Sequence, residues 1–249
     1  MTATSETDEV ALLQLEIETG WVSDPDGRLV RSRTPECRPV PLLTVGAGAC
    51  GLCWALSSDV PAPLDAALAD ALAATAPPEV TPTVGWAPGT AGTLVDLLAG
   101  VGALAAPGRG PAYLVPAGLR GPGGPDLVAG GRGDEERLRG MMPEHDRSTL
   151  AEPWTVALVD GRVAAVCETS RSAPTSVEAG VWTYEPYRRR GLAAAVTAAW
   201  ACQVAGRTAF YSTSEDNLAS QGVARRLGLR AIGQWWTVHG AEPGGPPGG

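Results

Sequence analysis

The chain of 249 residues carries 19 basic and 27 acidic side chains, and its net charge of −8 disfavours nucleic acid and anionic membranes as partners. It contains no lysine, so lysine-based catalysis is excluded. Apolar residues make up 44% of the chain, which is enough for a packed core, and the length suits one large domain or two small ones.

The cysteines and the N-terminal residues favour a cytoplasmic protein. The five cysteines are scattered, so they do not form the framework of a disulfide-rich secreted domain. The first residues lack the basic and apolar regions of a signal peptide, and no uncharged stretch resembles a membrane-spanning helix. Residues 1–9 and 241–249 are expected to be disordered tails.

The first half of the chain is predicted to form an α+β accessory domain over residues 10–105. Leu12–Ile17 alternates apolar and polar side chains, which predicts a half-buried strand. Asp24–Gly27 predicts a tight turn, because proline presets one backbone angle and glycine accepts a positive φ. The remaining predicted elements are strands at 28–33, 41–45 and 52–56 and helices at 65–75 and 90–104.

The second half, residues 106–240, is predicted to form a separate α/β domain that begins with a linker at 106–111. Asp160-Gly161 lies between two apolar runs, which is a strong hairpin signal. An alanine-rich stretch at 191–205 predicts a long helix. The other predicted elements are strands at 113–115, 126–129, 154–159, 162–169, 176–184, 208–212 and 231–239 and helices at 134–142 and 215–227.

Two motifs in the first half resemble sites of other protein classes. Gly46–Gly51 matches the glycine pattern of a dinucleotide-binding loop, but prolines interrupt the stretch where a helix and then a parallel strand should follow. We therefore interpret it as a glycine-rich turn. Cys50 and Cys53 form a C-x-x-C pair, which we interpret as two ordinary thiols, because only Cys37 is near enough to join them as a metal ligand. We predict no metal site.

The two histidines, His145 and His239, give little support to a serine hydrolase. A Ser-His-Asp triad would need one of them as its base, and the chain contains no G-x-S-x-G sequence. We interpret both as structural or solvent-exposed side chains.

The strongest chemical signal follows the strand predicted at 176–184. Three arginines, Arg188–Arg190, precede Gly191–Ala193 at the start of the long helix. The N–H groups at a helix N-terminus favour anions, small residues let a ligand approach the backbone, and arginine binds phosphate oxygens. The segment therefore predicts a binding site for a pyrophosphate.

These residues resemble the acetyl-CoA loop of the GNAT N-acetyltransferase superfamily. The pattern R-x-x-G-x-A at Arg188, Gly191 and Ala193 is followed by YSTSEDN, which ends at Asn217, and by a helix that ends in Leu227-Gly228. Both motifs and their separation agree with the superfamily. The resemblance covers about residues 154–239, and it extends more weakly to most of the chain, which is similar to a subfamily from high-GC bacteria.

The resemblance implies an α/β fold, with a mixed, mostly antiparallel twisted sheet that is flanked by helices and splayed where acetyl-CoA inserts. It also implies direct transfer of the acetyl group to the amine of a small molecule or peptide. The backbone of the central strand would pair with the pantetheine arm, and the loop and helix start would hold the pyrophosphate. The residues implied in coenzyme binding are Val181, Trp182, Thr183, Arg188, Arg189, Arg190, Gly191, Leu192, Ala193, Asn217 and Ser220.

The sequence identifies the catalytic residues less clearly than the coenzyme-binding residues. Glu178 is the first choice for the general base, because strand periodicity sets it on the same face as Gly180, and Glu168 is the second choice. Many members of the superfamily use a tyrosine seven residues after the asparagine as the acid, but that position is Ala224 here. The candidates for the acid are Tyr211, Tyr184, Ser212 and Ser220, unless the thiolate leaves unassisted.

Two other classes of function stay open. The missing tyrosine at Ala224 favours a non-catalytic acyl-CoA-binding or sensor domain. The accessory domain is compatible with a protein-interaction module that keeps the same fold. The amine acceptor is not identified by the sequence, and a homodimer is one assembly that it leaves open.

Overall fold

The computed structural model describes residues 7–34, 39–74, 88–102, 104–121, 126–131, 138, 140–142 and 150–241. Its contacts divide the chain into two compact units. Unit 1 comprises residues 1–112, 214–216 and 231–249, and unit 2 comprises residues 113–213 and 217–230. The domain limits predicted at 10–105 and 106–240 stay a prediction.

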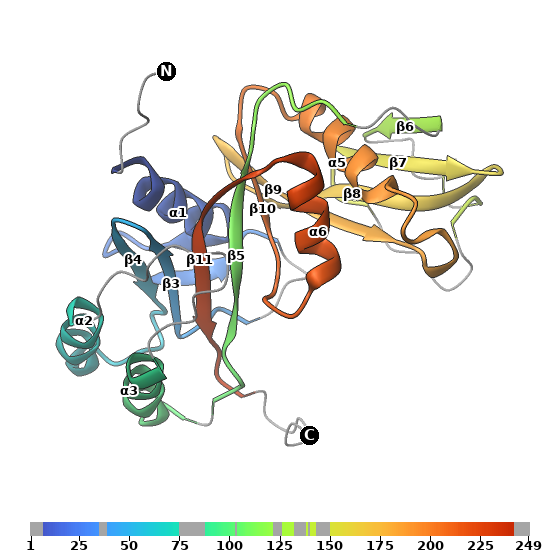
Figure 1. The fold of residues 1–249 in the computed structure, drawn as a ribbon. Coiled ribbons are helices and arrows are strands. Elements are labelled where there is room, and N and C mark those ends of the chain that lie inside the picture. The colour runs from blue at the N-terminus through green and yellow to red at the C-terminus, as the bar shows by residue number, and fades with distance from the viewer. Residues whose placement is uncertain are drawn as a thin grey trace. The chain divides into compact units, whose positions relative to one another are not determined.

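The sheet of unit 1 runs in the order β4-β3-β11-β5 (Figure 1). Its strands are β3 (Leu43–Gly48), β4 (Gly51–Leu56), β5 (Gly108–Val115, of which residues 108–112 lie in this unit) and β11 (Arg230–Val238). The strands expected at 41–45, 52–56 and 231–239 are confirmed. The linker expected at 106–111 is wrong, because β5 begins at Gly108. A side chain there would lie 3.2 Å from the Trp235 ring and from Thr237 Oγ1, so glycine permits a close approach.

One face of this sheet is covered by α1 (Thr7–Gly20), which contacts β3 and β4 (Figure 1). The strand expected at 12–17 is therefore wrong. Leu13 and Ile17 are both buried and lie one helical turn apart. A Cβ atom on Gly46 would lie 2.8 Å from Leu13 Cβ, and one on Gly233 would lie 2.9 Å from Leu13 Cδ1. The glycines thus let α1 pack closely on the sheet.

The opposite face of the unit 1 sheet packs against two helices. They are α2 (Asp65–Ala73), which follows the short η1 helix (Ala62–Leu64), and α3 (Pro88–Ala99). Both confirm helices predicted from the sequence. Their leucines share a buried cluster with side chains of β3 and β11. The buried residues from these elements include Leu68, Leu72, Leu94, Leu98, Val45 and Trp236.

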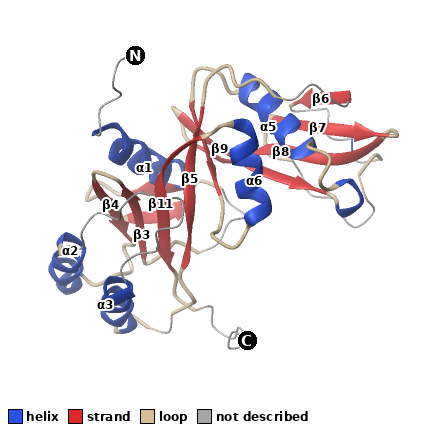
Figure 2. Ribbon diagram, viewed as in Figure 1, coloured by secondary structure: helices blue, strands red, loops and turns tan. Residues whose placement is uncertain are grey.

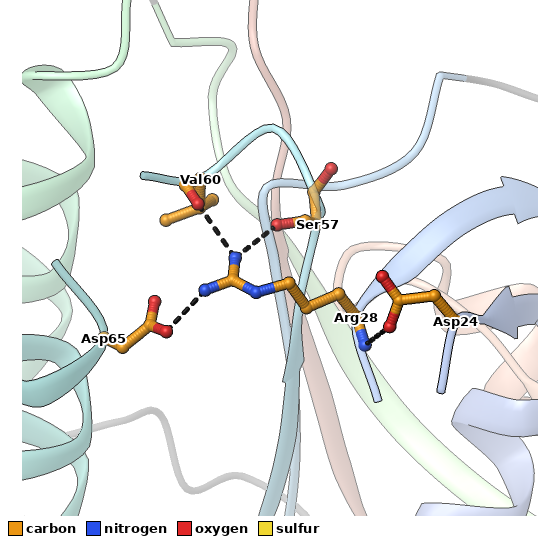
Figure 3. A network of polar contacts seen from close by, with 5 residues as sticks. All are labelled: Asp24, Arg28, Ser57, Val60 and Asp65. Atoms are coloured by element: carbon orange, nitrogen blue, oxygen red, sulfur yellow. Dashed lines mark hydrogen bonds and ion pairs between the residues drawn. The ribbon is translucent and has the colours of Figure 1, made fainter. Parts of the chain in front are cut away.

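A small hairpin, β1 (Trp21–Ser23) and β2 (Leu29–Ser32), completes the described part of unit 1. The turn predicted at Asp24–Gly27 is confirmed: Gly27 has a φ of 81°, and its N–H donates to Asp24 O at 3.0 Å. Arg28 follows the turn and points across to the segment between β4 and α2 (Figure 3). The strand expected at 28–33 is confirmed as β2.

The sheet of unit 2 runs in the order β10-β9-β8-β7-β6, and β5 lies next to β10 (Figure 1). Figure 2 draws β6 to β9 in red as strands. The pairings in this sheet are antiparallel over β6 to β9, whereas β9 and β10 are parallel. The strands are β6 (Asp126–Gly130), β7 (Trp154–Val159), β8 (Arg162–Ser172), β9 (Ser176–Thr183) and β10 (Thr208–Ser212). They confirm the predicted strands and the mixed, mostly antiparallel sheet.

Two helices, α5 (Leu192–Gln203) and α6 (Leu218–Leu227), share one buried cluster with side chains of this sheet. The β7–β8 hairpin turns at Asp160 and Gly161, whose φ values of 52° and 73° confirm the predicted turn. The helix expected at 215–227 starts later, at Leu218, because Asn217 Oδ1 accepts the Ser220 N–H at 3.0 Å as the N-cap. The helix expected at 134–142 lies mostly outside the described residues.

Candidate functional site

The loop between β9 and α5 leads into the N-terminus of α5, which can bind an anion. After the short η2 helix (Glu185–Tyr187), Arg189 and Gly191 adopt positive φ values of 60° and 79°. Gly191 is the N-cap of α5 and provides no side-chain hydrogen bond, and Ala195 N donates to Gly191 O at 3.2 Å. The N–H groups that precede Ala195 in this helix have no helical acceptor, so they favour negative charge.

The three loop arginines are exposed. Arg188 Nε donates to Thr183 O at 3.4 Å, and the Arg190 guanidinium lies 6.0 Å from the centroid of the Tyr187 ring. Within the described part of the chain, no ion pair joins these arginines to a carboxylate. Their charges are therefore available to a ligand.

A fourth arginine reaches this loop from α6. If Gly191 carried a Cβ atom, that atom would lie 3.1 Å from Arg226 Nη2 and 3.2 Å from Arg226 Cζ. The guanidinium thus lies across the glycine at the start of α5. Arg226 was not predicted from the sequence, because the packing of α5 against α6 sets this contact, and only the adjacent basic pair at 225–226 hinted at it.

A fork between β9 and β10 lies beside the same loop. The two strands pair in parallel only over residues 176–178 and 208–210, and the last recorded pair is Glu178 with Phe210. Beyond that pair, Val181–Thr183 has recorded pairing only to β8. The other backbone edge of Val181–Thr183 can therefore accept an extended ligand as an added strand.

Glu178 lies at the base of the fork and is 5% exposed. Ser212 Oγ donates a hydrogen bond to Glu178 Oε1, and Arg171 Nη1 lies 3.0 Å from Glu178 Oε2. The contact with Arg171 is an ion pair without hydrogen-bond geometry, so Oε2 keeps acceptor capacity. Arg171 was not predicted. A β-bulge between Thr169 and Arg171 shifts the register and sets Arg171 opposite Glu178.

Glu168, the second candidate base, lies on β8 opposite Gly180. Its Oε2 accepts the Ala151 N–H at 2.7 Å, so part of its acceptor capacity is already used. A side chain on Gly180 would lie 2.9 Å from Ser170 Cβ and 3.5 Å from Glu168 Cγ. Glycine at position 180 therefore permits the close approach of Ser170 from β8. The half-buried Trp182, two residues further along β9, packs against the cluster that contains Trp154 and Val166.

Tyr211, the first candidate acid, lies in the core beneath α5 and α6 and is 2% exposed. Its hydroxyl lies 2.6 Å from Ser220 Oγ. Burial raises the pKa of the Tyr211 phenol to about 12, although the hydrogen bond with Ser220 lowers it. Ala224, which stands where many relatives have tyrosine, is fully buried in the same core. Tyr211 is consequently a weak acid but a well-placed hydrogen-bond donor.

Leu192 and Tyr184 are also placed by packing. Leu192 buries its side chain in the core beneath α5, so it can offer a ligand only its backbone. Ala193, the next residue, is half-buried. Tyr184 packs against the same cluster as Trp182.

The motifs set aside in the first half have structural roles. Gly46–Gly48 belongs to β3 and Gly51 begins β4, so the turn interpreted at Gly46–Gly51 is confined to residues 49–50 between two antiparallel strands. Cys50 is exposed and Cys53 is buried, and burial raises the pKa of the Cys53 thiol to about 12, which makes it a poor nucleophile. His239 Nδ1 lies 3.1 Å from Pro39 O. His145 and Cys37 lie outside the described residues.

The described residues contain neither a cluster of potential metal ligands nor a membrane-spanning helix. No group of three or more His, Cys, Asp or Glu side chains is arranged to hold a metal ion there. Within the same ranges, no helix has both the length and the apolar character needed to cross a membrane.

Comparisons with known proteins identify a relationship for part of the chain. The GNAT acetyltransferase family matches residues 155–238. A GCN5-related N-acetyltransferase from Kribbella flavida is 23% identical, with a TM-score of 0.43, over 61% of this chain and 64% of its own. A GCN5-related N-acetyltransferase-like protein from Streptococcus suis is 20% identical, with a TM-score of 0.42, over 59% of this chain and 67% of its own.

An acetyltransferase of the GNAT family from Colwellia psychrerythraea is 14% identical, with a TM-score of 0.41, over 62% of each chain. The match thus spans between 62% and 67% of the length of these three proteins. No curated protein matches the chain.

Proposed function

We propose that this chain is an acetyl-CoA-dependent N-acetyltransferase, because residues 155–238 match the GNAT acetyltransferase family. It would move an acetyl group directly to the amine of a small molecule or peptide. The observation that carries the proposal is the open start of α5, where Gly191 has a φ of 79° and exposed arginines have no carboxylate partner in the described chain. This arrangement suits a diphosphate.

The described residues fit the coenzyme at this end of α5. A Cβ atom at Gly191 would contact the Arg226 guanidinium, so glycine preserves a space between helix start and arginine. The N–H groups of Gly191–Ala193 would hold the diphosphate, and the free edge of Val181–Thr183 would pair with the pantetheine arm. Asn217 uses Oδ1 to cap α6, which leaves its amide N–H groups for the pantetheine side.

The groups proposed for proton transfer lie on opposite faces of the sheet. Glu178 and Ser212 occupy one face at the base of the fork, and Tyr211 occupies the other, in the core with α5 and α6. An amine must be neutral to attack, so Glu178 would accept its proton while Ser212 and Arg171 hold the carboxylate in place. The coenzyme supplies the activated acetyl group and a thiolate leaving group.

Tyr211 would assist the leaving group through Ser220. With a pKa of about 12, the phenol gives up its proton less readily than an ordinary tyrosine. Its 2.6 Å contact with Ser220 Oγ fixes a pair of hydroxyls that can donate a hydrogen bond without full proton transfer. The catalytic role of Tyr211 is therefore proposed as hydrogen-bond donation.

A calorimetric titration with acetyl-CoA and with CoA tests the coenzyme site. We expect micromolar binding to the wild-type protein and a loss of at least about 100-fold in an Arg188→Ala/Gly191→Glu variant. The variant removes one cation and sets a carboxylate at the start of α5, and facing like charges cost several kcal/mol. A protein that binds neither ligand would contradict the proposed function. Wild-type protein that binds is then screened for acetyl transfer against a panel of primary amines.

One observation favours a second function. Ala224 replaces the tyrosine that many relatives use as the acid, and Tyr211 is buried with a raised pKa. A coenzyme-binding sensor without turnover would tolerate both features. Tight CoA binding combined with no transfer across the amine panel would support that function over catalysis.

A further inference from the structure

Tyr113 combines a buried ring with a hydroxyl group that the fold does not use. It lies in the second half of β5 and is 9% exposed. Within the described ranges, no hydrogen bond is recorded for its hydroxyl, and this oxygen is not among the buried polar atoms that lack a partner. The ring therefore packs in the core while the phenol oxygen keeps contact with solvent.

The two tyrosines of this core differ in what their hydroxyls can donate. The Tyr113 ring meets the Tyr211 ring edge-on, with 6.3 Å between the ring centroids and an angle of 67° between the planes. The Tyr211 hydroxyl is already engaged, because it lies 2.6 Å from Ser220 Oγ. In the part of the chain that the structure describes, only Tyr113 of this pair has a hydroxyl without a recorded acceptor. It is therefore the better donor to a ligand.

Tyr113 also lies at the level of the fork between β9 and β10. Tyr211, which its ring contacts, follows Phe210, and Phe210 belongs to the last recorded β9–β10 pair. The side chain of Val181 packs against the same cluster that contains Tyr113 and Tyr211, and the free backbone edge of Val181 is proposed to pair with the pantetheine arm. The phenol of Tyr113 is thus expected on the face of the sheet that the end of this arm reaches.

The position where many relatives have tyrosine belongs to the same core. Ala224 is fully buried in the cluster that contains Tyr113. Because protein cores are closely packed, alanine at this position leaves room that a tyrosine from another element can fill. Burial raises the pKa of the Tyr113 phenol, and the positive charge of Arg225, the residue after Ala224, lowers it. The same charge stabilises the phenolate that remains after a proton is given up.

We infer that Tyr113 is the general acid of the transfer and protonates the sulfur of the leaving thiolate. Tyr113 would give its hydroxyl proton to the sulfur as the carbon–sulfur bond breaks, while Glu178 takes the proton of the amine nitrogen that bonds to the acetyl carbon. Solvent then returns a proton to the Tyr113 phenolate and removes one from Glu178, so the protons balance. Tyr211 keeps its role as a hydrogen-bond donor. The inference rests on the proposed function, because it assigns a further catalytic residue to the same site.

Steady-state kinetics with acetyl-CoA and the amine found in the screen, together with calorimetric titration with CoA, test the inference. We expect Tyr113→Phe to lower kcat by about 100-fold, since general acid catalysis contributes about 10²- to 10⁴-fold. The dissociation constant for CoA should stay close to wild type, because the substitution keeps the ring and removes only the hydroxyl. Tyr184→Phe makes the same change in a tyrosine that packs in the other cluster, and it should lower kcat much less.

A double variant moves the phenol from β5 to α6. Tyr113→Ala/Ala224→Tyr removes the ring at position 113 and adds one at the position that many relatives use, which roughly conserves the volume of the core. Its kcat should exceed that of Tyr113→Ala by at least about tenfold, because the phenol is again available as an acid. A folded double variant that is no more active than Tyr113→Ala would contradict the placement of the acid beside α6.

Three results with the single variants would overturn the assignment and leave the proposed function standing. The first is a wild-type kcat in Tyr113→Phe. The second is an equal loss in Tyr113→Phe and Tyr184→Phe, which would indicate a general effect of removing a hydroxyl. The third is a loss of CoA affinity without a loss of kcat, which would make Tyr113 a binding residue. Wild-type protein that binds CoA but acetylates no amine would refute the catalytic function itself, and the inference with it. Thermal unfolding of each variant checks that the fold is retained.

Discussion

Two arginines, Arg28 in unit 1 and Arg226 in unit 2, have opposite surroundings. In unit 1, Arg28 Nη1 donates to Ser57 O at 3.0 Å and to Val60 O at 2.8 Å, and Nη2 pairs with Asp65 (Figure 3). In unit 2, no protein acceptor is recorded for Arg226 among the described residues. A guanidinium whose donors are satisfied by the protein stabilises the fold, whereas one without acceptors is free to bind an anion.

The comparison separates two kinds of mutational effect. Loss of Arg28 should lower the free energy of unfolding and leave coenzyme affinity unchanged, and loss of Arg226 should do the reverse. Glu178 is a test case, because protein groups contact both of its carboxylate oxygens, as in a structural residue, although we propose it as the base. These groups are Ser212 and Arg171.

Glu178→Gln is expected to have the largest effect. General base catalysis contributes about 10²- to 10⁴-fold, so kcat for the amine found in the screen should fall by about that factor. The dissociation constant for CoA should stay close to wild type, because the substitution lies outside the loop that holds the phosphates. Steady-state kinetics and calorimetry on the same preparations measure the two quantities.

Glu168→Gln is the matched control, because Glu168 lies on the adjacent strand and on the same face of the sheet. It should lower kcat much less than Glu178→Gln. If Glu178→Gln lowers the free energy of unfolding but leaves kcat intact, Glu178 has a structural role like that of Arg28, and another group is the base.

Arg28→Met is expected to lower the free energy of unfolding by about 3 kcal/mol, since Arg28 donates to two carbonyls, hydrogen bonds to charged groups contribute about 1.5–3 kcal/mol each, and the partly exposed Asp65 adds little. The substitution keeps the length of the side chain but leaves two carbonyls and a carboxylate without their donor. Urea denaturation measures the change. Arg31→Met on the exposed side of the same hairpin is the control and should change stability by less than about 0.5 kcal/mol. Equal effects of the two substitutions would show that the contacts of Arg28 add nothing.

The fold was predictable wherever the local sequence determines the element. Asp160-Gly161 specifies its hairpin by turn chemistry alone, and the alanine-rich stretch that became α5 has a strong helix propensity. The alternation in Leu12–Ile17 led to the wrong prediction of a strand, because the same residues also fit a helix. The glycines that let this helix pack on the sheet, Gly46 and Gly233, are far away in the chain. The same reason hid residues 108–112 of β5, where Gly108 makes room for an aromatic ring more than a hundred residues later.

The residues of the candidate site also divide into those that the local sequence predicts and those that depend on distant packing. The loop at Arg188–Gly191 could be predicted, because a strand, a basic turn and a helix start follow one another in sequence. Arg226 and Arg171 could not. The first depends on how α6 packs against α5, and the second depends on a β-bulge that shifts the register by one residue.

Tyr211→Phe is expected to have the smallest effect on stability, and this effect appears only at alkaline pH. The phenol has a pKa of about 12 in the folded protein and about 10 in the unfolded chain. Between these values the unfolded chain releases the proton while the folded protein retains it, so the free energy of unfolding falls as the pH rises above about 10. One pH unit in this range corresponds to about 1.4 kcal/mol.

Urea denaturation at pH 9.5 and pH 11 measures this dependence in both proteins. Between these two values, wild type should lose about 1.2 kcal/mol more stability than Tyr211→Phe, because the variant has no phenol to ionise at that position. Cys53 also has a raised pKa, but it is present in both proteins and cancels in the difference. Because Ser220 satisfies the Tyr211 hydroxyl, CoA affinity at neutral pH should be unchanged in the variant. If the free energy of unfolding falls equally in the two proteins between pH 9.5 and pH 11, Tyr211 is not shielded from solvent. If the variant binds CoA more weakly, the Tyr211 hydroxyl contacts the ligand instead of lying in the core.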